Sequence, residues 1–293
     1  MKLGAEGSGK GVAQMLLEKI LLCTDFSPSS EELLKCIPEL KQAGLKDVLL
    51  FHVMDPGLFT NEESELQEEC ASKLESIQKH LESLGLTVTT RVATGSPSER
   101  IVQEAEAENL SLIVLSSHGK GLIRSRFLGT TAFDVLRSTT TPLLIEKYIE
   151  LDQGKLQAYC QNKFNKVLIP VDFSEACIEM IEKIKEIKNI REIVLVSVVE
   201  KSESQQELEN RKKEWKEKLD IMEEEFVNLG YQVESHVKEG TASQNIMEVA
   251  EERQATLIAL ATRGAGAIDD LPIGSTIDAV ARQSKNPILV FPS

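Results

Sequence analysis

Two stretches of the sequence carry glycines and hydroxyl residues at a spacing typical of a phosphate-binding loop. They read Ser116-x2-Gly119-x9-Gly129-Thr130 and Ala261-x2-Gly264-x9-Gly274-Ser275. Glycines let backbone amides approach a ligand closely and permit positive φ. A Gly-Thr or Gly-Ser pair that opens a helix adds free amides, the helix dipole and a hydroxyl, which together favour an anion. A duplicated structural turn would keep the same spacing, so these residues alone leave phosphate binding and a plain turn as alternatives.

The two loops belong to a repeat that spans the chain. The stretch KILLCTDFS at 19–27 recurs as KVLIPVDFS at 166–174, and LIVLSSHGKG at 112–121 recurs as LIALATRGAG at 257–266. Matched positions differ by 147 at Asp25 and Asp172 but by 145 from Val53 and Val198 onward, which indicates a two-residue deletion after the first helix. Because such repeats indicate duplicated units, we expect one domain at 1–147 and a second at 166–293. Residues 148–165 would be a linker with a helical turn or two.

Short apolar runs alternate with amphipathic stretches in each copy. The expected strands are 20–24, 48–52, 87–93, 112–116 and 142–145, then 166–171, 193–198, 232–237, 257–261 and 288–291. Runs such as LIVL are apolar on both faces, as in parallel strands that helices cover on both sides. Charged helices are expected at roughly 62–84 and 203–229, and the capping boxes SPSE and TASQ would start two others at 96 and 241. The alternation predicts an α/β protein with two tandem, doubly wound (Rossmann-like) domains, each with a five-stranded parallel sheet.

In open α/β sheets, ligands sit beyond the carboxyl ends of the strands, where the winding reverses. In each copy an aspartate ends strand one, a valine ends strand two, and the glycine loop follows strand four. The ordered set TDFS, HV, SHGKGL and LGTT resembles the universal stress protein family, and the resemblance covers nearly the whole chain as a tandem. Nucleotide-binding members of that family carry Gly-x2-Gly-x9-Gly-Ser/Thr.

The resemblance implies an adenine nucleotide, ATP or AMP, with Mg²⁺ bound through its phosphates. It implies that the strand-one aspartate contacts adenine or its ribose, that the valine backbone contacts adenine, and that the loop holds ribose and phosphates. The implied positions are Asp25, Val53, Ser116, Gly119, Gly129, Thr130 and Thr131 in the first copy, and Asp172, Val198, Ala261, Gly264, Gly274, Ser275 and Thr276 in the second.

Both copies depart from the family pattern at its first glycine, which is Ser116 in one copy and Ala261 in the other. A strict need for positive φ at these positions would not be met cheaply. The loops also differ in charge, with Lys120, Arg124 and Arg126 in the first and Arg263, Asp269 and Asp270 in the second. We therefore predict that the first copy is the better ATP site, and that the second prefers AMP or binds more weakly.

The composition excludes several function classes. A formal net charge of −14 argues against nucleic-acid binding. No apolar run approaches the roughly 20 residues that span a bilayer, and the N-terminus lacks the pattern of a signal peptide. Five cysteines without a CxxC pair indicate reduced thiols and a cytoplasmic protein. Cysteine and histidine spacing predicts no metal site.

Two further patterns in the sequence do not indicate a functional site. GAEGSGK at 4–10 matches the Walker A pattern except at its last place, Gly11, but too few residues precede it for the strand that a P-loop needs. We interpret it as a flexible N-terminal segment. Ser116 and Ser117 have no adjacent histidine–acid pair, so we predict no catalytic residue.

The sequence therefore favours a nucleotide-binding stress protein that uses its ligand as a signal. The alternatives are an interaction or scaffold protein with degenerate, empty sites and, third, a slow ATPase. The last strands, TPLLIE and NPILVF, are apolar edges, and an unprotected edge invites pairing. We expect them to pair with each other and form an internal pseudo-two-fold dimer; homodimerisation of the whole chain is left open.

Overall fold

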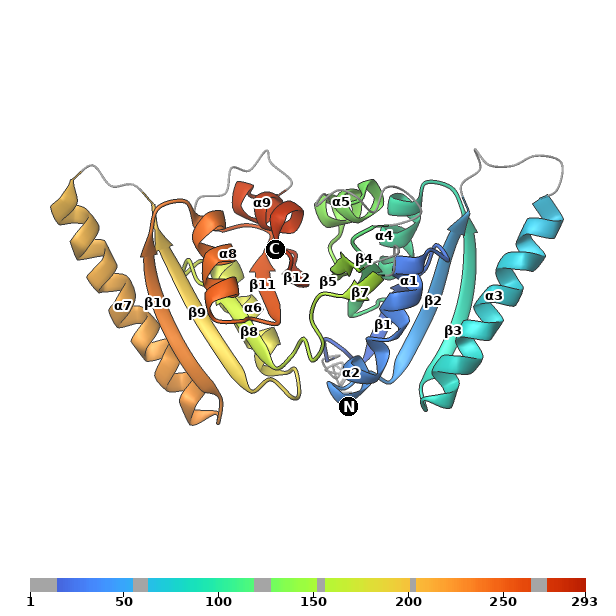
Figure 1. Ribbon diagram of the computed structural model, residues 1–293, viewed down its shortest axis with the longest axis horizontal. Helices are drawn as coiled ribbons and strands as arrows, with labels where there is room; N and C mark the ends of the chain where they lie inside the picture. Colours follow the sequence, from blue (N-terminus) through green and yellow to red (C-terminus); the bar gives the residue numbers. More distant parts are fainter. Residues whose placement is uncertain (1–14, 55–62, 119–127, 152–155, 201–203, 265–272) are drawn as a thin grey trace, which may run out of the picture.

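The computed structural model describes residues 15–54, 63–118, 128–151, 156–200, 204–264 and 273–293 (Figure 1). The Walker A-like stretch, Gly119 and most of the charged loop residues lie outside these ranges. The first half contains β1 (Lys19–Cys23), α1 (Pro28–Leu34), α2 (Ile37–Gln42), β2 (Asp47–Met54), α3 (Glu63–Ser83), β3 (Thr87–Thr94), α4 (Pro97–Ala107), β4 (Leu112–Ser116), α5 (Thr130–Ser138) and β5 (Leu143–Glu146). A short hairpin follows, made of β6 (Tyr148–Glu150) and β7 (Leu156–Ala158). The second half contains β8 (Lys166–Pro170), α6 (Glu175–Lys185), β9 (Glu192–Val199), α7 (Gln205–Asn228), β10 (Gln232–Glu239), α8 (Ala242–Glu252), β11 (Leu257–Ala261), α9 (Ser275–Gln283) and β12 (Ile288–Phe291).

The strands of both halves form one ten-stranded sheet. Its order is β10-β9-β8-β11-β12-β5-β4-β1-β2-β3. Pairing is parallel within each half and antiparallel only between β5 and β12, where Leu144 lies opposite Leu289 and Ile145 opposite Ile288. The predicted pairing of the two last strands is confirmed. Figure 1 shows the halves on either side of this seam, with α3 and α7 at the outer ends.

Two hydrophobic cores cover the two faces of the sheet and run through both halves. Side chains alternate between the faces along each strand, so Ile20 and Leu22 of β1 enter one core and Leu21 enters the other. Helices α1, α2, α3, α6 and α7 bury their apolar residues in the first core, and α4, α5, α8 and α9 in the second. The doubly wound α/β architecture expected from the sequence is confirmed.

The linker differs from the expectation of helical turns. It folds back as a hairpin in which Tyr148 pairs with Ala158 and Glu150 with Leu156. The prediction of helical turns was wrong, because Tyr148 and Ile149 favour extended backbone and form a strand that follows β5 with only Lys147 between. The hairpin packs against α1 of the first half.

The first helix is also broken in one half only. In the first half, Pro38 lies in the opening turn of α2, and a proline inside a continuous helix would lack a hydrogen bond and clash with the preceding turn. The second half has no proline there and forms one continuous helix, α6. The predicted capping residues Ser96 and Thr241 do start α4 and α8, but neither side chain forms the capping hydrogen bond.

None of the helices in the described ranges combines the length and apolar content that crossing a lipid bilayer requires.

Helix α7 allows a matched test of how the core stabilises the fold. Leu219 is 0% exposed, whereas Ile221, on the same helix, is 70% exposed. Leu219→Ala should lower the free energy of unfolding by about 2–5 kcal/mol, because it leaves a cavity. Ile221→Ala should change it by less than about 0.5 kcal/mol. Urea unfolding followed by circular dichroism measures both, and equal losses would contradict the placement of this helix.

Candidate functional site

The predicted residues gather at the carboxyl edge of the sheet in each half. Strands β1 and β4, and likewise β8 and β11, are neighbours at the point where the winding reverses. At the strand ends, Asp25 and Asp172 follow β1 and β8, Val53 and Val198 lie near the ends of β2 and β9, and Ser116 and Ala261 end β4 and β11. At the helix starts, Gly129 and Gly274 are the N-caps of α5 and α9. The first turns of these two helices hold Thr130 and Thr131, and Ser275 and Thr276. This edge is where open α/β sheets bind ligands.

The strand-one aspartate is held by a tight turn in both halves. Asp25 Oδ1 accepts a hydrogen bond from the Ser27 amide at 3.0 Å. Asp172 Oδ1 accepts from the Ser174 amide at 3.0 Å and from its hydroxyl at 2.7 Å. The residue between, Phe26 or Phe173, has φ of 58° or 61°. Bulky residues rarely adopt this conformation, and it persists only where the surroundings impose it.

A side chain from the second strand supports each turn. The protonated Nδ1 of His52 donates to the Thr24 carbonyl at 2.8 Å, and the Ser197 hydroxyl donates to the Val171 carbonyl at 2.7 Å. Both carbonyls directly precede the aspartate, so both bonds anchor the end of strand one. Sequence reasoning missed this role. The signal was present, because the repeat aligns His52 with Ser197 and both can donate a hydrogen bond.

Glycine is the N-cap of both α5 and α9, and within the described residues no side chain caps either helix start. The Gly129 amide donates to the Ser117 carbonyl at 2.7 Å, and the Gly274 amide to the Thr262 carbonyl at 3.1 Å. A Cβ at Gly129 would lie 3.1 Å from the Ser117 oxygen, so this close approach favours glycine. Neither cap has a side chain to bond the first-turn amides, which have no acceptor within their helix. These amides can therefore bind an anion.

In the second half, the strand-one acid and the glycine loop are in direct contact. A Cβ built on Gly264 would overlap Asp172 Oδ2. The backbone of this glycine therefore closes over the carboxylate, and the two predicted residues belong to one site. The equivalent position in the first half, Gly119, lies outside the described residues.

The first half holds the start of its loop by two hydroxyls that the second half lacks. Ser29 Oγ and Ser116 Oγ both donate to the His118 carbonyl, at 2.6 and 2.7 Å. The repeat places alanines, Ala176 and Ala261, at the matching positions. Ser116 ends a strand with extended backbone, so it does not need the conformational freedom of glycine. Its hydroxyl instead holds the start of the loop against the end of β4, and the Ser29 hydroxyl ties the same carbonyl to α1.

Two cysteines near the site are neutral thiols at pH 7. Burial raises the pKa of Cys177 to about 11 and raises that of Cys23 far above its ordinary value. Neither supplies the thiolate that metal binding or nucleophilic attack requires.

The family model described as "Universal stress protein family" matches residues 17–147 and again residues 163–292. The chain belongs to the universal stress protein family. A universal stress protein of Methanocaldococcus jannaschii is 33% identical over 156 residues, which cover 45% of this chain and 96% of that protein. The relative therefore corresponds to one half of the tandem.

Solved structures match the universal stress protein tandem as a whole. The crystal structure of a universal stress protein from Archaeoglobus fulgidus DSM 4304 has a TM-score of 0.73 and 25% identity, and the match covers 95% of this chain and 97% of that one. A putative universal stress protein from Pseudomonas aeruginosa UCBPP-PA14 has a TM-score of 0.67 at 17% identity, over 94% of each chain. The second likeness concerns the fold alone.

The contact between Gly264 and Asp172 predicts a coupled pair of substitutions. Gly264→Ala should lower the free energy of unfolding by about 1–3 kcal/mol, because its Cβ overlaps the carboxylate. In an Asp172→Ala background the same change should have an effect below about 0.5 kcal/mol, which a double-mutant cycle in urea detects.

Gly274→Ala is the matched control for this cycle, because its Cβ would lie at an ordinary 3.6 Å from the Thr262 oxygen. Equal losses from Gly264→Ala in the two backgrounds would show that the carboxylate does not lie over the glycine.

Proposed function

We propose that each half binds an adenine nucleotide, ATP or AMP, at the carboxyl edge of its strands, and that the protein uses this nucleotide as a ligand or signal in a stress response. The observation that carries the proposal is the repeated pairing of a rigidly held aspartate with an uncapped helix start. Both halves keep this arrangement although different side chains support it, His52 in one and Ser197 in the other.

The chemistry of each part suggests what it would hold. The amides at the starts of α5 and α9, with the exposed Thr130 and Ser275, suit phosphate oxygens. The carboxylates of Asp25 and Asp172 suit the hydroxyls of a ribose or the donors of adenine. Mg²⁺ would accompany a triphosphate through the phosphate oxygens.

Substitution of the helix-start glycines tests the proposal and the predicted ranking of the two sites by ATP affinity. Gly129→Arg should abolish most ATP binding, and Gly274→Arg should have the smaller effect, because the first loop carries more basic residues. Isothermal titration with ATP and with AMP measures both. Thr130→Ala and Ser275→Ala are milder companions, because they remove a hydroxyl and leave the backbone unchanged.

A second measurement distinguishes binding from the alternatives. Protein purified under native conditions should release ATP or AMP on denaturation, as detected by mass spectrometry. If no nucleotide is released and none titrates, a scaffold with empty sites explains the fold better. Equal loss of ATP binding in the two arginine variants would refute the order of the sites. ATP consumption above that of the arginine variants would support slow hydrolysis.

The two serines that bond the His118 carbonyl can be exchanged for the alanines that stand at the matching positions of the second half. Ser29→Ala with Ser116→Ala gives the first half the alanines of the second. We expect its ATP affinity to fall roughly tenfold, because two hydrogen bonds that preorganise the loop are lost. The reciprocal control, Ala176→Ser with Ala261→Ser, should leave the first site unchanged. An unaltered affinity after the first exchange would show that these hydroxyls act on the fold alone.

A further inference from the structure

The apolar residues at the seam are nearly the same in both halves. Strand β5 contributes Leu143, Leu144 and Ile145, and strand β12 contributes Ile288, Leu289 and Val290. Each strand could therefore pair with a copy of itself almost as well as with the other. Backbone pairing and apolar contact do not explain why the first half takes the second as its partner.

A buried ion pair beside the seam does distinguish the halves. Lys163 lies just before β8, and its side chain is 0% exposed. Its Nζ is 3.1 Å from Glu146 Oε2 at the end of β5 and 2.9 Å from Glu39 Oε2 on α2. The amide of Phe164 also donates to Glu39 Oε1, at 3.2 Å. The segment that enters the second half is thus held by two carboxylates of the first.

The lysine is charged in this environment. Burial alone would lower the pKa of Lys163, but the carboxylates of Glu146 and Glu39 outweigh burial and raise that pKa above its ordinary value. Glu146 is itself 0% exposed, and burial raises the pKa of its carboxyl, but the ammonium of Lys163 only 3.1 Å away opposes this shift and favours the carboxylate. The pair therefore places opposite charges in the protein interior, and removal of Lys163 would leave the buried Glu146 without its cation.

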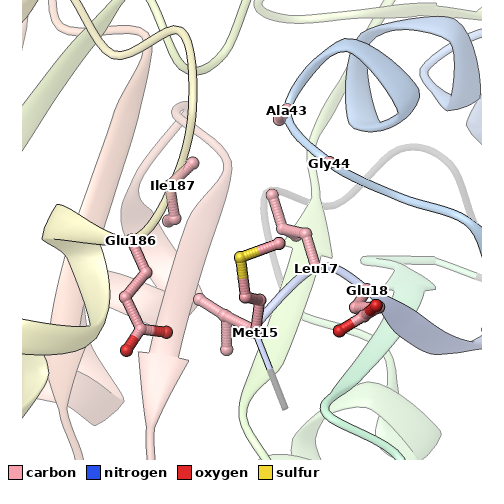
Figure 2. A pocket seen from close by; sticks show the side chains of 8 residues that line it. Met15, Leu17, Glu18, Ala43, Gly44, Glu186 and Ile187 are labelled. Carbon is pink, nitrogen blue, oxygen red and sulfur yellow. The ribbon is translucent and has the colours of Figure 1, made fainter. Parts of the chain in front are cut away.

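The pseudo-two-fold counterparts of this pair are apolar. The offset of 147 relates Lys163 to Leu16, and the offset of 145 relates Glu146 to Phe291. Leu16 and Phe291 are buried in the same core. Figure 2 shows where the segment of Leu16 meets the second half: a narrow cleft with Met15 on one side and Glu186 and Ile187 on the other. The positions of Lys163 and Glu146 are thus charged on one side of the axis, and their counterparts on the other side are buried apolar residues.

We propose that the seam is a heterotypic interface, which accepts the other half of this chain and rejects a second copy of either half. In a pairing of two first halves, Leu16 would face Glu146 and leave each carboxylate buried without its cation. In a pairing of two second halves, Lys163 would face Phe291 in place of Glu146, and it would keep only Glu186, the exposed counterpart of Glu39, as a carboxylate partner. Unpaired buried charge against the wrong partner is a known source of specificity.

A second contact adds to this selection. Lys147 is buried, and its Nζ donates to the Ala281 carbonyl at the end of α9, 2.6 Å away. The matching residue in the second half is Pro292, which has no side-chain donor. A pairing of two second halves would therefore have no such bond, so this contact selects against that pairing alone.

Reassembly of a cut chain tests the proposal. A protease site is inserted between Gln161 and Asn162, which are both exposed. The folded chain is cut, and both pieces are unfolded in urea and then refolded together by dilution. Native mass spectrometry counts the pairs that form. Wild-type pieces should return almost entirely as first–second pairs. With Glu146→Phe and Lys163→Leu, both crossings become apolar, and pairs of like pieces should rise toward about half of the total, the statistical share. Pairs of second halves should stay the rarer like pair, because they lack the Lys147 bond.

Stability of the intact chain provides an independent readout. Lys163→Leu should lower the folding equilibrium constant roughly 100-fold or more, because Glu146 stays buried without its cation. Adding Glu146→Phe should restore most of that loss. Lys166→Leu is the matched control, because the Lys166–Glu192 pair is partly exposed, and its removal should change the constant by less than about fivefold.

Several results would overturn the proposal. Like pairs from the wild-type pieces would show that the seam does not discriminate. If the double variant still formed first–second pairs alone, residues other than Glu146 and Lys163 would determine the choice of partner. A Lys163→Leu chain as stable as the wild type would show that the buried pair imposes no penalty when one partner is missing.

Discussion

The antiparallel pairing of β5 with β12 is the contact on which the rest of the molecule depends. It joins two parallel five-stranded sheets into one and removes two apolar edges that would otherwise be open to other chains. It also makes each hydrophobic core continuous across the halves, because Leu144 meets Leu289 on one face and Ile145 meets Ile288 on the other. The helices, and the loops between them, are positioned against this common sheet.

Much of the fold could be predicted from the sequence because the information is local and is written twice. Apolar runs such as LIVL identify buried parallel strands on their own, and the repeat confirms their order. The hairpin after β5 and the break between α1 and α2 were missed. The hairpin depends on the path of the chain after β5, and the helix break depends on the single residue Pro38.

The candidate site was also predictable only in part. The spacing of the glycines and the two aspartates predicted that these residues gather at one edge of the sheet, because strand ends and helix starts follow from the order of elements. The hydrogen bonds that support the site could not be predicted, because they join residues that are distant in sequence. Ser29 reaches the His118 carbonyl across 89 positions. The positive φ of Phe26 and Phe173 likewise follows from the turn that surrounds them. At both the seam and the site, the two halves keep the same backbone arrangement with different side chains.

Because both strands of the seam belong to one chain, their pairing is a unimolecular event. Dilution weakens the association of separate subunits by mass action, but it does not act on partners joined by a short connection. The ten-stranded sheet should therefore be equally complete at the lowest and the highest abundance of the protein. A cell could vary the amount of this protein widely without changing the fraction that is assembled.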